Sequence, residues 1–194
     1  MPRLTRDSLL TLEAYARERA SFRARAVAHK RERTVPLGEH VTLMFEDELT
    51  VRYQIQEMLR IEKTFEEAGI QDELEVYNPL IPDGSNLKAT MLIEYEDIDE
   101  RQKALAQMKG IESRVWVKVG ELLPVYAIAD EDLERANPQK TSSVHFLRFE
   151  LSPPMVNAFK SGANVALGVD HPAYCAKIAS LEEPARSALQ QDLA

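Results

Sequence analysis

The chain has 194 residues, of which 44% are hydrophobic, and its formal net charge is −8. This length and composition suit one globular domain with a sizeable core. Cys175 is the only cysteine, so one chain can form neither an intramolecular disulfide nor a zinc site built from thiolates. No apolar run is long enough for a signal peptide or a membrane span, and we therefore expect a cytoplasmic protein without a membrane partner.

Positive charge is concentrated at the start of the chain, where residues 1–33 hold nine Arg or Lys residues and four acidic residues. Within a single domain over 1–194, this segment predicts a basic N-terminal helix from about residue 7 to residue 33. Such a helix either packs on the acidic remainder of its own chain or docks with an acidic partner. No basic run is interleaved with aromatic residues, which argues against a nucleic-acid partner. The expected apolar stripe of the helix is Leu9, Leu12, Ala16, Ala20 and Val27.

The rest of the chain changes between strand and helix patterns. Residues 41–46 alternate apolar and polar side chains and predict a strand, whereas the periodicity over 50–68 predicts an amphipathic helix that ends at Gly69. Further strands are expected at 87–95, 115–119, 123–129, 142–151, 163–169 and 174–179. Further helices are expected at 97–109, 130–139, 152–162 and after Ser180.

The order of these elements indicates the fold class. Strands 115–119 and 123–129 adjoin with no helix between them, so a simple alternation of strands and helices is excluded. We predict an α+β fold, in which a mostly antiparallel sheet of about six strands packs with a long N-terminal helix and three or four further helices.

Glu62 lies at an unusual place in the helix predicted over 50–68. On a helical wheel it falls within the apolar side formed by Val51, Ile55, Met58, Leu59, Ile61 and Phe65. A buried, unpaired carboxylate would cost several kcal/mol, so Glu62 must be paired, hydrogen-bonded, protonated or bound to a cation. One hypothesis is a purely structural ion pair with Arg23 of the first helix. The alternative is a catalytic base or a metal ligand.

Histidines supply the other titratable candidates. His145 lies on the apolar side of its strand, as a satisfied core residue or as a catalytic acid, base or ligand. His145, His40 or His171 combined with Glu57 or Glu62 would form a nitrogen and oxygen ligand set suited to zinc, iron or manganese. No local metal motif, such as HExxH or an aspartate-rich calcium loop, is present.

Two arginines complete the predicted site. Arg60 and Arg148 are candidates for clamping a small anion in a pocket between the 50–68 helix and the sheet. With Glu62 and His145 as catalytic candidates, this pocket would belong to a metal- or anion-binding enzyme.

Several long stretches resemble one bacterial family. They include "YNPLIPDGSNLKATMLIEY", "VYAIADEDLERANPQKTSSVHFLRFEL" and "GVDHPAY", and the resemblance runs from about Arg17 to the C-terminal helix. The family is catalogued as domain of unknown function 3501. Its genes often lie near those of rubrerythrin-like and iron–sulfur proteins, which implies a redox or peroxide-stress context but assigns no catalytic residue.

Three functions therefore stay open. The first is a cytosolic accessory or binding protein that docks with an iron–sulfur or rubrerythrin-like redox partner. The second is the metal- or small-anion-binding enzyme, and the third is a scaffold in which Glu62 is only ion-paired. A homo-oligomer is compatible with each of them.

Overall fold

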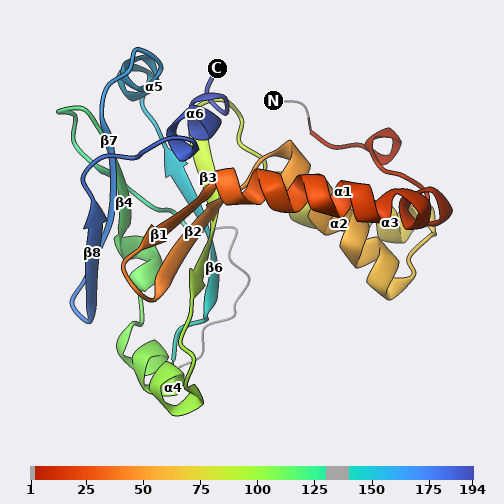
Figure 1. Ribbon diagram of the computed structural model, residues 1–194, viewed down its shortest axis with the longest axis horizontal. Helices are drawn as coiled ribbons and strands as arrows, with labels where there is room; N and C mark the ends of the chain where they lie inside the picture. The colour runs from red at the N-terminus through yellow and green to blue at the C-terminus, as the bar shows by residue number, and fades with distance from the viewer. Residues whose placement is uncertain (1–2, 130–139) are drawn as a thin grey trace.

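The computed structural model describes residues 3–129 and 140–194 and confirms the α+β class (Figure 1). Within these residues the chain forms six α-helices and eight strands. The strands form two four-stranded antiparallel sheets, whereas the sequence predicted one sheet of about six strands. The helix predicted over 130–139 lies outside the described residues. No described helix has the length and apolar character needed to cross a membrane.

The two sheets pack face to face around the main hydrophobic core. The first sheet has the order β1 (Thr34–Leu37), β2 (Val41–Phe45), β3 (Asn86–Ile93) and β6 (Val144–Glu150). The second sheet has the order β5 (Val125–Tyr126), β4 (Val115–Val119), β7 (Val165–His171) and β8 (Tyr174–Ile178). Alternate residues of each strand point inward, so Leu43, Met91 and Leu147 of the first sheet share one buried cluster with Val117 and Leu167 of the second.

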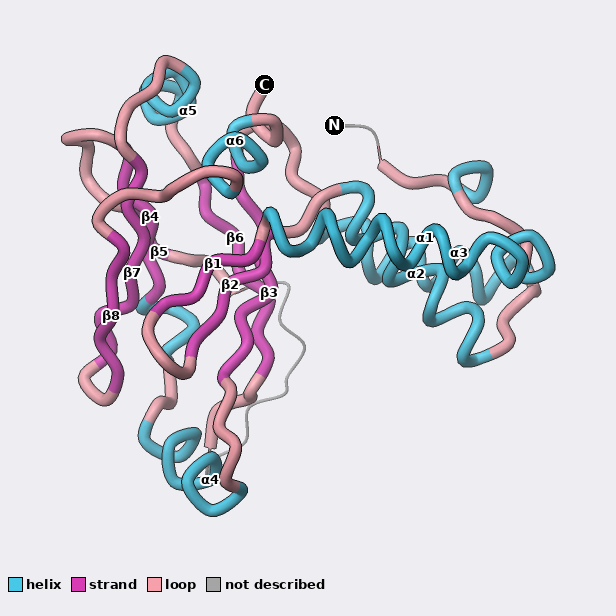
Figure 2. Tube along the Cα trace, viewed as in Figure 1, coloured by secondary structure: helices cyan, strands magenta, loops and turns pink. Residues whose placement is uncertain are grey.

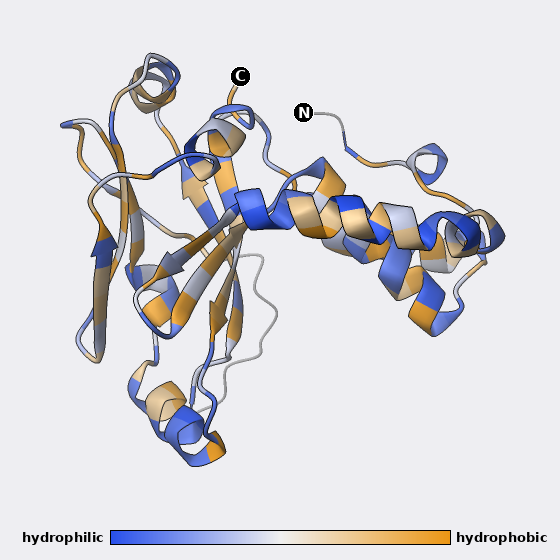
Figure 3. Ribbon diagram, viewed as in Figure 1, coloured by the Kyte–Doolittle hydropathy of each residue, from blue (hydrophilic) through white to orange (hydrophobic). Residues whose placement is uncertain are grey.

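Helices cover the ends of this sandwich. α4 (Ile98–Gln107) lies at one end, and α5 (Pro153–Lys160) and α6 (Ala185–Gln190) lie at the other (Figure 1). A short 3₁₀-helix, η3 (Ile111–Arg114), leads into β4. Figure 3 shows hydrophobic and hydrophilic residues along the same strands, as expected where one face of each sheet lies in the core.

A second group of helices extends from one side of the sandwich (Figures 1 and 2). It contains α1 (Leu12–Glu32), α2 (Glu48–Glu62) and α3 (Glu67–Tyr77), with the 3₁₀-helices η1 (Arg6–Ser8) and η2 (Asn78–Leu80). We call residues 3–32 and 48–81 the helical arm. The arm has a small core of its own, made of Leu4, Leu9, Val51, Ile55, Leu59, Ile70, Leu74, Leu80 and Ile81.

Two elements of the first half differ from the sequence prediction. The segment Thr34–Leu37, expected as a break because of Pro36, forms β1 at the edge of the first sheet, where a missing N–H is tolerated. The helix predicted over 50–68 ends at Glu62, because Lys63 adopts a left-handed φ of 56°. Gly69, the predicted stop, lies inside the additional helix α3.

The first helix buries a different side from the predicted one. Tyr15, Phe22 and Ala26 are buried, whereas Ala16 and Ala20 of the predicted stripe are exposed. The larger aromatic side chains face α2, where Phe22 stacks on Tyr53 with ring centroids 6.1 Å apart. The aromatic side chains therefore determine which side of α1 is buried, because burying them removes more apolar area from water than burying alanine side chains does.

Arg33 joins the arm to the sheet and to the C-terminal helix. Its side chain is 2% exposed, and it donates hydrogen bonds to the carbonyl oxygens of Phe45 at 3.0 Å and Glu46 at 3.2 Å. The guanidinium also forms an ion pair with Asp192, and its Nη1 lies 3.5 Å from Oδ2 of Asp47. These partners compensate a buried charge that would otherwise destabilise the fold.

Candidate functional site

Glu62 is not the buried carboxylate that the sequence predicted. It is exposed, and so is Arg23, and no ion pair between them is found in the described residues. On the helical wheel Glu62 does lie close to Ile55, but it is the last residue of α2 and the chain turns away at Lys63. The exposed Ile61 and Phe65 confirm that packing ends before this point.

The partly buried carboxylate of α2 is Glu57. It accepts hydrogen bonds from Arg19 Nε at 2.8 Å, Tyr15 Oη at 2.6 Å and Arg60 Nη2 at 3.2 Å. The bond from Arg19 is the main reason why the pKa of Glu57 falls to about 2. Glu57 thus joins α2 to α1, and Arg60 pairs with Glu57 within α2. Both charges are therefore paired inside the arm and do not line a pocket with the other predicted residues.

The buried histidines are satisfied by protein partners. Nε2 of His145 lies 3.0 Å from Oγ1 of Thr141 and 3.1 Å from the carbonyl oxygen of Ser142. Nε2 of His171 lies 3.0 Å from the carbonyl oxygen of Lys109. Across residues 3–129 and 140–194, no three His, Cys, Asp or Glu side chains are grouped to hold a metal ion. The predicted metal candidates Glu62, His145, His40 and His171 therefore do not converge.

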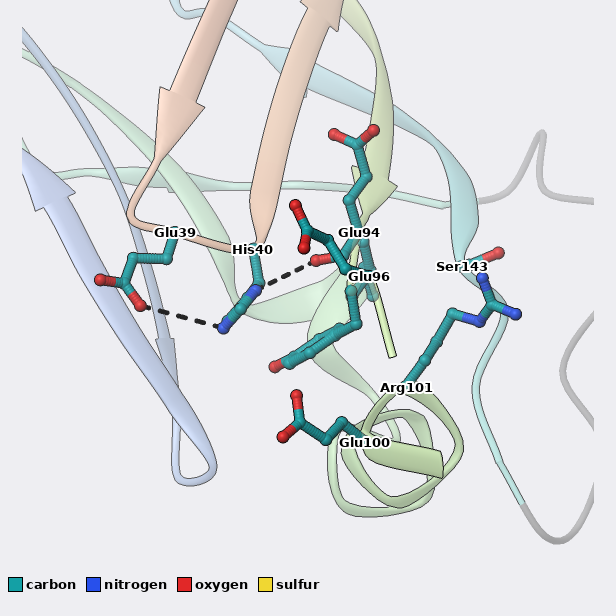
Figure 4. Close-up of a pocket in the computed structure, with 9 residues that line it drawn as sticks. Glu39, His40, Glu94, Glu96, Glu100, Arg101 and Ser143 are labelled. Atoms are coloured by element: carbon teal, nitrogen blue, oxygen red, sulfur yellow. Dashed lines mark hydrogen bonds and ion pairs between the residues drawn. The ribbon is translucent and has the colours of Figure 1, made fainter. Parts of the chain in front are cut away.

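His40 lines a wide hollow of about 680 Å³ at one end of the first sheet (Figure 4). Its ring stacks on Tyr95 with centroids 3.8 Å apart, and its Nδ1 lies 3.0 Å from the carbonyl oxygen of Glu94. Four carboxylates line the hollow, those of Glu39, Glu94, Glu96 and Glu100. All four are exposed, so water already solvates their charges and the hollow is an open acidic surface.

Arg148 lies on the face of the first sheet that looks toward the arm. It forms an ion pair with Glu150 and lines a cavity of about 330 Å³ together with Lys88, whose Nζ donates to the carbonyl oxygen of Pro79 at 2.6 Å. Register explains this polar surface: β3 and β6 pair Lys88 with Arg148 and Asn86 with Glu150. The predicted anion candidates Arg60 and Arg148 lie on different elements, in the arm and in the sheet, and do not form one clamp.

A second cavity of about 240 Å³ lies on the same sheet face, between that face and the helices α1, α2 and α3. The sequence predicted a pocket in this region, between the 50–68 helix and the sheet, but none of the predicted site residues lines the cavity. Its apolar walls are Met44, Val51, Leu80, Val144 and Phe146. Its polar lining is Lys30, Glu46, Gln54, Tyr77 and Thr90. Apolar walls with a few convergent polar groups are typical of small-ligand sites.

Glu46 is the most unusual of these polar residues, because it is an acidic residue that is only 7% exposed. One oxygen accepts a hydrogen bond from Oγ1 of Thr50 at 2.5 Å, and the other accepts from Oγ1 of Thr90 at 2.6 Å. No Arg, Lys or His of the described ranges lies within ion-pair distance of this carboxylate. Glu46 is therefore a buried carboxylate that two threonine hydroxyls hold in a fixed orientation, without an ion pair in the described residues.

Sequence reasoning missed Glu46 for an identifiable reason. The alternation over 41–46 puts it on the same side as Met44, away from the main core, which reads as an ordinary solvated end of a strand. A threonine four residues later, Thr50, was the available local signal. The second partner, Thr90, arrives through the pairing of Met44 with Thr90 between β2 and β3, and that register is not encoded locally.

Comparisons with known proteins identify relatives but no activity. A family model described as "Protein of unknown function (DUF3501)" matches residues 3–193. A crystal structure at 1.90 Å resolution, described as a novel protein of unknown function from Burkholderia pseudomallei K96243, is 56% identical, with a TM-score of 0.94 and 100% of both chains covered. No curated protein matches. The chain belongs to the DUF3501 family.

Proposed function

We propose that this protein binds a small organic molecule that carries a protonated amine, and that the cavity around Glu46 is its site. The observation that carries the proposal is a buried carboxylate that lines a cavity without an ion pair in the described residues. An ammonium group would supply the missing positive charge and would donate charge-assisted hydrogen bonds to oxygens already held by two threonines. The volume of about 240 Å³ lies below the range of drug-sized ligands and favours a compact one.

The direct test measures the binding of linear n-alkylamines to the protein, by calorimetry and by the shift in thermal unfolding. Wild-type protein should bind saturably, and Glu46→Gln should weaken binding about tenfold or more while keeping the shape of the side chain. Glu94→Gln is the matched control, since it removes an exposed carboxylate from the acidic hollow. Equal binding by wild type and Glu46→Gln would overturn the proposal.

A second variant tests the same site in case Glu46→Gln does not fold. Val144→Trp should fill the cavity from β6 without altering the carboxylate or its threonine partners. Loss of amine binding in a folded Val144→Trp protein would locate the ligand in the cavity. Retained binding would place the amine elsewhere and would contradict the assignment.

An accessory role beside a redox partner is the second candidate. It is supported by the redox context that the family resemblance implies and by the exposed arginines of α1, such as Arg17, Arg23 and Arg31. These charges would complement an acidic patch on a rubrerythrin-like or iron–sulfur protein. Purified partner should then bind at low salt and dissociate as ionic strength rises, and Arg23→Glu with Arg31→Glu should weaken the complex. Salt-independent binding, or none, would contradict this role.

A further inference from the structure

The cavity around Glu46 contains a second charge of opposite sign. Lys30, from the last turn of α1, lines it as well. Glu46 and Lys30 are not within the 4.0 Å that defines an ion pair, and within the described parts of the chain neither side chain forms an ion pair with any other residue. Opposite charges that line one small cavity usually meet, because their attraction grows as water is excluded. Here their charged atoms stay more than 4.0 Å apart, although both residues line the cavity.

Contacts on both sides help to keep the two charges in place. Thr50 and Thr90 hold the carboxylate of Glu46 from α2 and β3. The ammonium of Lys30 lies 5.6 Å from the centre of the Tyr53 ring, a favourable cation–π distance. Its backbone is fixed too, because the carbonyl oxygen of Lys30 accepts a hydrogen bond from Oγ1 of Thr34 at 2.7 Å. Glu46 and Lys30 therefore line the cavity from different elements of the fold.

We infer that the ligand is a small zwitterion, with its ammonium group on Glu46 and its carboxylate on Lys30. The inference rests on the proposed amine-binding function and specifies the other end of the ligand. The apolar walls of the cavity include Val51, Leu80 and Phe146, and they suit a short methylene chain. An unbranched ω-amino acid has this pattern of charge, chain and charge. A ligand with the amine alone would leave Lys30 without a counter-charge.

The experiment tests the preference for zwitterions over amines, and it also measures the distance between the two charged side chains. Calorimetry would compare ω-amino acids from β-alanine to 6-aminohexanoate with n-alkylamines of equal length. In the wild type, one amino acid should bind about tenfold more tightly than its matched alkylamine, since a second charge pair forms. Its chain length would report the distance between Lys30 and Glu46.

Two variants separate the inference from the function on which it rests. Lys30→Met keeps the apolar stem and should abolish the advantage of the amino acid. Alkylamine binding should not weaken, because the lost ammonium carries the same charge as the amine. Glu46→Gln should weaken both ligands. Lys63→Met, in the turn after α2, is the control for loss of a lysine from the arm.

Each outcome has one meaning. Equal affinity of wild type for the amino acid and the alkylamine would overturn the zwitterion and leave amine binding intact. An unchanged advantage in a folded Lys30→Met protein would also overturn it. No binding of either class would overturn both proposals. A tenfold advantage that is lost only on removal of Lys30 would support the assignment.

Discussion

The sheet sandwich and the helical arm are stabilised in different ways. The sandwich holds a continuous apolar cluster that both sheets and parts of α4, α5 and α6 supply. The arm has a separate apolar cluster of only nine buried residues and adds polar contacts, such as the bonds of Gln56 and Asn78 to the backbone of the N-terminal segment. A small apolar core contributes less free energy, so the arm depends more on buried polar contacts that fix its geometry.

The largest effect should come from breaking the joint between the two regions. Arg33→Met should lower the free energy of unfolding by about 3–5 kcal/mol, because Asp192 and the carbonyl oxygens of Phe45 and Glu46 would lose their buried donor. Urea denaturation measures the change. Arg31→Met removes an exposed arginine two residues away and should have little effect. Similar stability of the two variants would contradict the role assigned to Arg33.

Matched core substitutions should show whether the arm unfolds separately. Leu59→Ala in the arm and Leu147→Ala in the sandwich each remove a side chain that is 2% exposed, at a cost of about 2–4 kcal/mol. Hydrogen exchange should then speed up mainly within 3–32 and 48–81 for Leu59→Ala, but throughout the described chain for Leu147→Ala. Uniform loss of protection in both variants would mean that the arm and the sandwich unfold as one unit.

The polar contacts of the arm can be tested one at a time. Gln56 is fully buried, and its side chain accepts from the N–H of Leu10 at 2.6 Å. Gln56→Ala should cost about 2 kcal/mol, because the backbone of Leu10 loses its partner. Gln71→Ala, at an exposed position of α3, is the control. Thermal unfolding measures both, and equal melting temperatures would refute the contribution of Gln56.

The smallest effect should appear as a change in acid stability. Because the pKa of Glu57 is lowered to about 2 from an ordinary value of 4.5, its stabilisation is complete above pH 4.5 and is lost as pH falls toward 2. Glu57→Gln should therefore lower stability by about 1 kcal/mol at neutral pH, with water screening part of the interaction. The gap between wild type and variant should close on acidification. A constant gap from pH 7 to pH 2 would contradict the assignment.

Much of the fold was predictable from local patterns. Alternation identified β2, β3 and β6, and capping residues such as Asp97 predicted the start of α4, where its side chain accepts from the N–H of Glu100. β1 was missed because Pro36 reads as a break when the strand's position in the sheet is unknown. The division of the strands into two sheets was also inaccessible, since pairings such as β3 with β6 join residues far apart in the chain.

The candidate site shows the limit of helical-wheel reasoning. A wheel gives the direction of Glu62 around α2 but not its position along the helix axis, and the packed part of α2 stops before it. Glu57 was named only as one ligand candidate among several, because its partners Tyr15 and Arg19 come from another helix. Charge asymmetry was the better guide, since one of its two interpretations, a basic first helix packed on its own chain, agrees with the ion pair between Arg19 and Glu57.

The polar surface beneath the arm has a consequence for solubility. β3 is buried on both sides, and its side chains toward the arm are Asn86, Lys88 and Thr90. If the arm swung away from the sheet, water would meet amide, ammonium and hydroxyl groups on this central strand rather than aliphatic ones. Association through β3 would then be disfavoured, whereas Met44, Val144 and Phe146 on the neighbouring strands form an apolar surface that needs the arm as its cover.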